Sequence, residues 1–484
     1  MTDAISRLRS PRPGDSLGTR EDRPFWASRN VKIFASLIIS IAIVQGMSKG
    51  GKLPSDEFAR RRAVLLNELR ELNAIAVIHS AAQVERNNGV DHPYRQESNF
   101  YYLTGWVYPD AVLVLSPKED ESKEAEATLF VPERDIKREL WTGPRPGVSE
   151  AGQLPEINES IAYKNFFDYL PKLIEPYERL VISCGGDRDF ENQIRHSLEG
   201  SYHHPQIVQE ANSLIKSMRL FKSDFEITAI ERAIDITGAS LLETLPKIPD
   251  LKYEYEVQAE IEYGFKKRGV ERFGFPSIVG SGKNATFLHY EDNKGALSSG
   301  ELILMDIGAE WDYYSADITR TVPVSGRFSS EQAKIYQLVL DAQMAVIQSI
   351  RPGVAFKETN RIAIEVITNG LVDLGLLSGD PATLIAERKY KKFFMHGTSH
   401  WLGLDVHDVG GYLDDSGEKH KFKAGMVITV EPGIYIQEAA DIDPKWWNIG
   451  VRIEDDVLIT DEGHRILSAE IPKTIAEIEA IMNP

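Results

Sequence analysis

The chain has 484 residues, and 55 Lys and Arg against 73 Asp and Glu give it a formal net charge of −18. At ~100 to 200 residues per domain, this length predicts two or three domains, and a 42% share of hydrophobic residues excludes a disordered or fibrous chain. The acidic balance argues against nucleic acid as a partner, because that partner requires clustered Lys and Arg, and the single Cys184 excludes an internal disulfide.

The first 46 residues differ in charge from the remainder. They hold seven basic and four acidic residues, a net +3, which leaves −18 − 3 = −21 for the rest. Residues 33–44 are uncharged and mostly apolar, too short for a membrane span of about 20 residues but typical of a secretory signal. We predict a signal peptide or short membrane anchor over residues 1–50, and hence a periplasmic, secreted or membrane-anchored protein. The alternatives are a buried element of the first domain and a cytoplasmic chain that begins at Met47.

Residues 51–218 are predicted to form a mixed α/β domain. Apolar residues at helical spacing indicate a helix over residues 56–69, and the run 74–79 indicates a buried strand. Further short strands are expected at 111–115, 127–131 and 180–183.

Residues 219–484 are predicted to form a second domain, so the fold class is α/β (α+β). Ser223 followed by Glu226 three residues later is a capping box, which marks the start of a long helix. Helices are also expected at 253–268, 329–350 and 355–376, and strands at 301–311, 314–324, 425–430 and 450–460.

Two aspartates stand out in this domain. Asp306 ends an alternating run and shares a face with Leu302 and Leu304, where a lone buried carboxylate is unfavourable. Asp317 lies in the following strand, and the odd separation 317 − 306 = 11 allows the two to be directly opposed in a hairpin. Such a pair binds a cation between its carboxylates, or shares a proton, or consists of two solvated loop residues.

The last third of the chain adds glutamates in apolar strands, Glu431 and Glu454, and three of the eleven histidines fall within residues 396–407. His396 and His400 have the i, i+4 spacing of a zinc-binding helix. The required Glu after the first His is absent, and Gly397 disfavours a helix. A ligand set of mostly oxygens with one histidine favours a hard ion such as Mn²⁺, Co²⁺ or Mg²⁺.

These residues, in their sequence contexts, match one family. Asp306, Asp317 in Ser-Ala-Asp-Ile-Thr-Arg, His400 in His-Gly-Thr-Ser-His-Trp-Leu-Gly, Glu431 in Val-Glu-Pro-Gly-Ile-Tyr and Glu454 in Arg-Ile-Glu-Asp-Asp resemble the five ligands of the dinuclear pita-bread metallopeptidases. Within that group the chain most resembles the Xaa-Pro aminopeptidases (aminopeptidase P). Residues 94–105, 140–145 and 218–223 resemble the amino-terminal domain of the family and its junction, so the resemblance runs from about Leu53 to the end.

The resemblance implies a role for each site residue. Asp306 and Asp317 would chelate one divalent ion, most consistent with Mn²⁺, His400 and Glu431 would hold a second, and Asp317 and Glu454 would bridge both. Glu431 would also shuttle a proton. Three histidines, His289, His396 and His407, match those of the family that bind the substrate and stabilise the oxyanion. Arg452 lies two residues before Glu454, so it is expected on the same face as a partner of a ligand carboxylate.

The implied substrates are peptides with proline at the second position, whose tertiary amide lacks an N–H. Trp141 resembles an aromatic residue that lines such sites, and the alternative is an ordinary packed tryptophan. Relatives are often dimers or tetramers, so a homo-oligomer is expected. The rival functions are a prolidase acting on dipeptides only, a creatinase-like hydrolase without metal, and a non-catalytic pita-bread binding module. The last two lack ligands that this chain retains.

Overall fold

The computed structural model describes residues 53–117, 126–183, 187–199, 205–208, 211–413 and 420–483. The predicted targeting segment, residues 1–50, and Cys184 lie outside these ranges. Among the helices of the described ranges, none is both long enough and apolar enough to cross a membrane.

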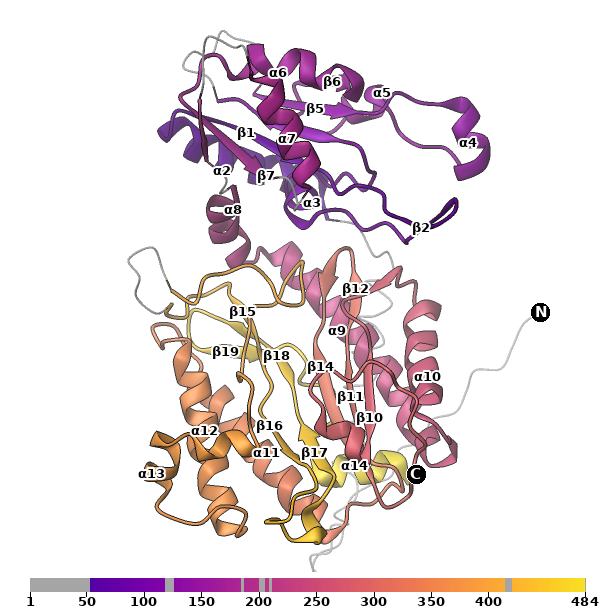
Figure 1. Ribbon diagram of the computed structural model, residues 1–484, viewed down its shortest axis with the longest axis vertical. Coiled ribbons are helices and arrows are strands. Elements are labelled where there is room, and N and C mark those ends of the chain that lie inside the picture. Colours follow the sequence, from indigo (N-terminus) through magenta and orange to yellow (C-terminus); the bar gives the residue numbers. More distant parts are fainter. Residues whose placement is uncertain are drawn as a thin grey trace, which may run out of the picture. The chain divides into compact units, whose positions relative to one another are not determined.

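The amino-terminal part is built on a six-stranded mixed sheet with the order β6-β5-β4-β1-β7-β8. Strand β1 (Ala74–His79) runs parallel to β7 (Arg179–Ser183) and antiparallel to β4 (Val112–Leu115). Helix α2 (Ser55–Glu71) covers one face of β1, and helices α6 (Phe166–Ile174) and α7 (Arg188–Ser197) cover the other (Figure 1). Because both faces are buried, β1 is apolar from Ala74 to Ile78, and the prediction of a buried strand at 74–79 is confirmed.

The other elements of this part are shorter. They are β2 (Glu85–Asn87), β3 (Val90–Asp91), α3 (Ser98–Thr104), β5 (Ala127–Val131), α4 (Ile136–Thr142), α5 (Val148–Ala151), β6 (Glu159–Ala162), β8 (Gln206–Val208) and α8 (Ala211–Leu220).

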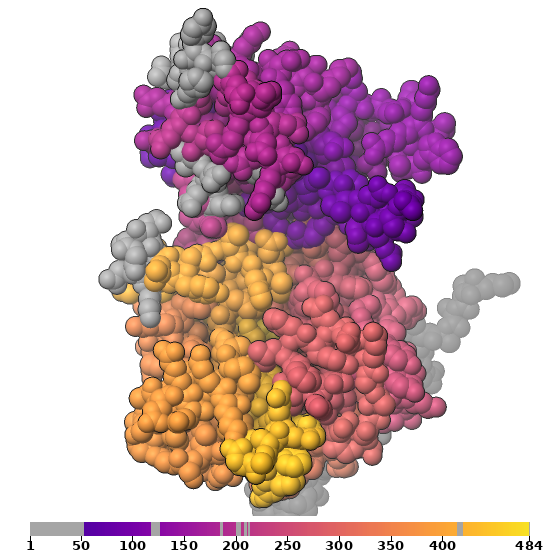
Figure 2. All heavy atoms as spheres, in the orientation of Figure 1, coloured from indigo at the N-terminus to yellow at the C-terminus, as the bar shows by residue number. Residues whose placement is uncertain are grey.

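Two helix pairs flank the strands of the second part. Helix α9 (Asp224–Thr244) packs against α10 (Glu254–Lys267), and α11 (Ser330–Ser349) packs against α12 (Lys357–Asp373). The predicted capping box is present, since the Ser223 hydroxyl accepts from the Glu226 amide and the Glu226 carboxylate accepts from the Ser223 amide. Helix α12 forms part of the orange outer surface in Figure 2. The short helices α13 (Pro381–Ala386) and α14 (Ile475–Met482) complete the α-helices of the described chain.

Three strands that the sequence predicts as continuous are interrupted. Residues 301–311 form β11 (Leu302–Ile307) and β12 (Ala309–Trp311), and residues 314–324 form β13 (Tyr314–Ser315) and β14 (Ile318–Pro323). Strands β12 and β13 leave the β10-β11-β14 sheet and join β9 (Arg272–Phe273). At the break the backbones approach so closely that a Cβ on Gly308 would lie 2.0 Å from the Ala316 carbonyl oxygen. The alternating pattern contains no signal for this bend.

The same interruption recurs nearer the carboxyl end. Residues 450–460 form β17 (Ile449–Arg452) and β18 (Asp455–Ile459), which pair with β16 (Gly433–Ile436) and β15 (Val427–Val430) respectively. Strand β10 (Ile278–Ser281) pairs with β11 at the edge of the β10-β11-β14 sheet. Strand β19 (His464–Ile466) pairs with β18 at the edge of the β15-β18-β19 sheet. As a result Asp317, Glu431 and Glu454 all lie in breaks between strands, outside the regular ladders on either side.

Candidate metal centre and active site

A cavity of about 480 Å³ opens where the interrupted strands meet. All nine residues selected from the sequence line it: His289, Asp306, Asp317, His396, His400, His407, Glu431, Arg452 and Glu454. Its apolar wall comes from residues that the sequence analysis did not select: Phe275, Pro276, Ile278, Leu288, Val406 and Tyr412. The tertiary structure therefore brings together residues that are up to 165 positions apart, from His289 to Glu454.

The two aspartates are diagonal neighbours and not a directly opposed pair. Strand β11 pairs with β14 so that Asp306 faces Thr319, and Asp317 lies two residues before Thr319. The prediction of direct opposition is therefore wrong. The register follows from a two-residue turn at Asp312 and Tyr313, which both have positive φ (48° and 72°), as a type I′ turn requires. Diagonal neighbours on one face remain within side-chain reach.

His400 is held beside the carboxylates by its backbone and by one ring nitrogen. The Thr429 amide donates to the His400 carbonyl at 3.0 Å, and His400 Nδ1 lies 3.0 Å from the Trp401 carbonyl oxygen. A carbonyl only accepts, so Nδ1 carries the proton and Nε2 presents a lone pair to the cavity. Nε2 lies 3.3 Å from Asp317 Oδ2 and 3.6 Å from Glu431 Oε1.

The ligand atoms are close enough to share an ion. One ligand atom each from Asp317, His400 and Glu454 lies within 4.8 Å of the others. Oδ1 of Asp306 is buried and has no hydrogen-bond partner, whereas its Oδ2 accepts from Arg452 Nη2 at 2.6 Å. A buried carboxylate oxygen without a partner is costly, and a cation would satisfy it.

Burial and mutual repulsion dominate the electrostatics of this cluster. Desolvation raises the pKa of Asp317 well above its usual range, and the carboxylate of Asp306 raises it further. Desolvation and Asp317 raise the pKa of Glu454 in the same way, and burial also raises the pKa of Glu431. Carboxylates this close need protons or cations between them, so the residues fit divalent metal ions, and their mostly oxygen chemistry fits hard ones.

The chain resembles known protein families and solved structures. The model of "Metallopeptidase family M24" matches residues 228–461, and that of "Aminopeptidase P, N-terminal domain" matches residues 58–182. A Xaa-Pro aminopeptidase of Haemophilus influenzae is 40% identical over 436 residues, which cover 89% of this chain and 98% of that protein. A Xaa-Pro aminopeptidase of Escherichia coli is 37% identical with the same coverage. The solved structure of the Pseudomonas aeruginosa aminopeptidase PepP superposes with a TM-score of 0.84 at 41% identity, covering 89% of this chain and 98% of that one.

The chain belongs to the M24 metallopeptidase family. The expected fold, an amino-terminal mixed α/β domain followed by a pita-bread catalytic domain, is confirmed by these matches. Membership of a metallopeptidase family implies divalent metal ions, in agreement with the acidic cluster.

One site residue of this M24 domain was missed by the sequence analysis. The buried hydroxyl of Tyr435 accepts from Arg452 Nη1 at 2.9 Å and lies 2.8 Å from His396 Nε2. His396 Nδ1 lies 2.7 Å from the Gly397 carbonyl, so Nδ1 donates and Nε2 accepts from Tyr435. Burial, with Arg452 nearby, lowers the pKa of His396 to about 3, which keeps the ring neutral. The only signal in the sequence was a tyrosine four residues after Glu431 in an apolar strand.

His289 lies on a loop that one buried carboxylate organises. Glu254 Oε1 accepts from the Ser281 amide at 2.7 Å and from Asn284 Nδ2 at 2.9 Å. Its Oε2 accepts from the Tyr290 hydroxyl at 2.9 Å and from the Gly295 amide at 2.6 Å. Helix α10 thus fixes both ends of the loop that carries His289 to the cavity.

Trp141 is not a packed tryptophan. Its side chain on α4 is 90% exposed, so the alternative of an ordinary buried residue is wrong. It does not line the cavity of its own chain.

Arg320 holds the backbone at Glu454 in place. Its buried guanidinium donates to the Glu454 carbonyl at 2.5 Å and to the Ile471 and Pro472 carbonyls at 2.9 Å. It also forms an ion pair with the Asp455 carboxylate at 2.9 Å. These bonds fix the break between β17 and β18.

Replacing Arg320 by glutamine is expected to lower the free energy of unfolding by about 3–5 kcal/mol, because it breaks a buried ion pair and leaves several carbonyls without a donor. Denaturant unfolding followed by circular dichroism measures the change. Arg327→Gln is the control, since Arg327 is 72% exposed and approaches Glu479 only to 3.6 Å. Equal effects of the two substitutions would contradict the assigned role of Arg320.

Proposed function

We propose that the protein is a metal-dependent aminopeptidase that hydrolyses the bond between the N-terminal residue of a peptide and a following proline. The observation that carries the proposal is the convergence of four carboxylates and His400 in one cavity that apolar side chains also line. The apolar wall suits the hydrocarbon ring of proline. Two relatives, each aligned with this chain over 98% of its own length, are named Xaa-Pro aminopeptidases.

We propose two divalent ions in this cavity, with Mn²⁺ as the physiological metal. Asp306 and Asp317 would hold one ion, His400 and Glu431 the other, and Asp317 and Glu454 would bridge them. When bound, such ions polarise a carbonyl and lower the pKa of bound water towards neutrality.

The protein residues supply positioning and proton transfer. Glu431 would take a proton from the attacking water and pass it to the leaving amine. His289 and His407 are exposed on the cavity wall, where they can bind the substrate and stabilise the oxyanion. His396 also lines the cavity, and its Nε2 lies 2.8 Å from the Tyr435 hydroxyl.

A comparison of substrates tests this function. The purified protein loaded with Mn²⁺ is expected to release the first residue of Arg-Pro-Pro, and excess chelator is expected to stop the release. Cleavage of Gly-Pro without cleavage of the tripeptide would instead establish a prolidase. Activity that survives exhaustive chelation would favour the metal-free hydrolase, and no cleavage of either peptide would favour a binding module.

Three further expectations belong to the same proposal. The segment 1–50 would be a targeting or anchoring extension, residues 51–218 the amino-terminal domain and 219–484 the catalytic domain. The protein would be a dimer or tetramer that binds peptides and no nucleic acid. Amino-terminal sequencing of protein from its native host tests the processing, and sedimentation velocity tests the oligomeric state.

A further inference from the structure

The segment from Trp401 to Gly411 carries His407 and contains no helix or extended strand. His407 lines the cavity, and the centroid of its ring lies 4.3 Å from that of His400. Asp405 and Asp408 flank His407 in sequence, and neither lines the cavity. Backbone hydrogen bonds hold part of the segment, such as that from the Leu402 amide to the Val427 carbonyl, and the side chains of the two aspartates add further contacts.

Asp408 is held by two buried cations. Its Oδ1 accepts from Arg219 Nη2 at 2.5 Å and its Oδ2 accepts from Lys222 Nζ at 3.1 Å. All three side chains are at most 2% exposed. A buried group of this kind is stable only while its charges are matched, so it tolerates little displacement of Asp408.

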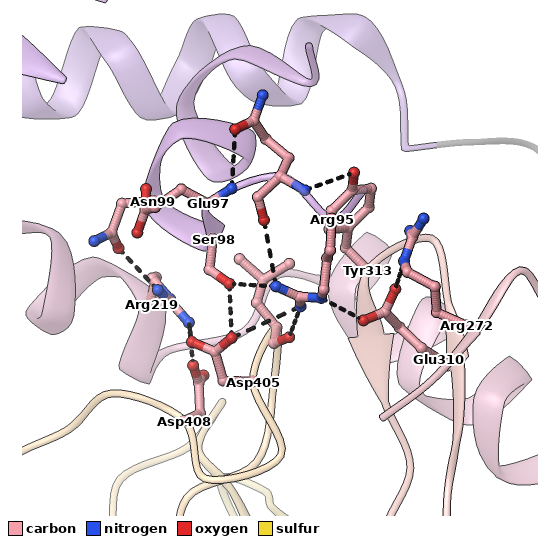
Figure 3. Close-up of polar contacts among 12 residues, drawn as sticks. Arg95, Glu97, Ser98, Asn99, Arg219, Arg272, Glu310, Tyr313, Asp405 and Asp408 are labelled. Carbon is pink, nitrogen blue, oxygen red and sulfur yellow. Dashed lines mark hydrogen bonds and ion pairs between the residues drawn. The ribbon is translucent and has the colours of Figure 1, made fainter. Parts of the chain in front are cut away.

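Asp405 is held by the same arginine and by the amino-terminal domain. Its Oδ2 accepts from Arg219 Nη2 at 2.7 Å, and its Oδ1 accepts from the Ser98 hydroxyl at 2.6 Å (Figure 3). Arg95 adds a hydrogen bond to the Leu404 carbonyl at 2.6 Å and an ion pair with Glu310 at 2.6 Å. Both Arg95 and Ser98 lie in the part of the chain matched by the amino-terminal domain model.

Arg219 is the centre of the network. Its Nη2 contacts both aspartates, and its Nη1 donates to Asn99 Oδ1 at 2.8 Å (Figure 3). The asparagine belongs to α3 of the amino-terminal domain, and the two aspartates belong to the catalytic segment. One guanidinium thus joins the two domains through the two aspartates that flank a proposed catalytic histidine in sequence.

We propose that Arg219 is a positioning residue for His407, which it fixes through Asp405 and Asp408, and that Ser98 and Asn99 make the amino-terminal domain part of this device. The inference rests on the proposed function, because it assigns to His407 a contact with the reacting peptide. A contact that strengthens in the transition state affects kcat more than KM.

The kinetic test uses the half-buried partner, Asp405, since removal of Arg219 itself takes away a buried cation that two carboxylates share and threatens folding. Asp405→Asn in the full-length metal-loaded enzyme is expected to lower kcat by about tenfold with KM changed less than about twofold, because small misplacements of a catalytic group are costly. In a His407→Ala background the same substitution is expected to cause no further loss of kcat. Equal losses in both backgrounds would overturn the proposal.

A matched control comes from an exposed ion-pair cluster. Arg361 on α12 contacts Glu358 and Glu365 with a side chain that is 59% exposed. Arg361→Gln is expected to leave kcat and KM at their wild-type values.

Hydrogen exchange followed by mass spectrometry tests the positioning without reference to activity. Asp405→Asn and Ser98→Ala are expected to speed exchange in peptides covering 401–411 and to leave those from α11 unchanged. Unchanged exchange at 401–411 would overturn the inference even if kcat fell. If the wild-type enzyme cleaves no Xaa-Pro peptide, the proposed function fails, and the exchange result still decides whether this network orders the segment.

Discussion

Replacing Glu454 by glutamine is expected to lower kcat/KM by at least about 10³-fold, equivalent to about 4 kcal/mol of transition-state stabilisation. Glu454 is buried, lies within ligand distance of Asp317 and His400, and is the proposed bridge between the two ions. A glutamine amide offers one neutral oxygen in place of a shared carboxylate. Steady-state kinetics and metal analysis of the purified variant measure the loss of activity and of bound metal.

The same substitution is expected to raise the melting temperature of the metal-free protein. The carboxyl pKa of Glu454 is raised by desolvation and by Asp317, so its charge is unfavourable in the absence of cations. Glutamine removes that charge, and its amide oxygen can still accept from the Thr319 hydroxyl, which lies 2.7 Å from Glu454 Oε2. Glu462→Gln is the matched control at an exposed position. A variant that keeps full activity, or one that melts lower without metal, would contradict the assigned role.

Removal of metal is expected to abolish turnover and to make stability depend strongly on pH. The raised pKa values of Asp317 and Glu454 mean that the metal-free fold binds more protons than the unfolded chain. The contribution of these two carboxyl groups to the free energy of unfolding is therefore fully present below their ordinary pKa of about 4 and is lost as pH rises through the raised values. Bound ions take the place of those protons, so the metal-loaded protein does not show this loss.

Melting curves between pH 5 and pH 8, with and without chelator, measure this effect. At a metal concentration of 100 times the dissociation constant, the loaded protein is expected to gain about 2.7 kcal/mol. The difference in melting temperature between loaded and metal-free protein should widen as pH rises, and Glu454→Gln should narrow it. Parallel curves would show that the acidic cluster does not hold a metal.

The nature of the metal-binding residues could be predicted from the sequence because burial in an apolar strand is itself visible there. Asp306 shares its face with two leucines, and a carboxylate in that position requires a proton or a cation. The helix start at Ser223 was equally predictable, since a capping box is a local hydrogen-bond pattern. The residue roles carried over by resemblance remain predictions, whereas the cavity that gathers these residues is now described.

The relative placement of the site residues was not predictable, because it depends on contacts between distant segments. The turn at Asp312 and Tyr313 sets the register that places Asp306 opposite Thr319, and nothing in the alternating pattern distinguishes it from a turn one residue earlier. Tyr435 is part of the site because β16 pairs with β17, and this pairing brings the tyrosine hydroxyl to Arg452.

The sequence by itself determined the chemical types of the site, the buried strands and the helix starts, because each follows from local periodicity or local hydrogen bonding. Only the tertiary structure decided where the strands break. A Cβ on Gly450 would lie 2.1 Å from the Ala285 carbonyl oxygen, a close approach of segments more than 160 residues apart that no local pattern encodes. It also decided that Arg219 joins both domains beside His407, because long-range packing alone brings a buried cation to two carboxylates.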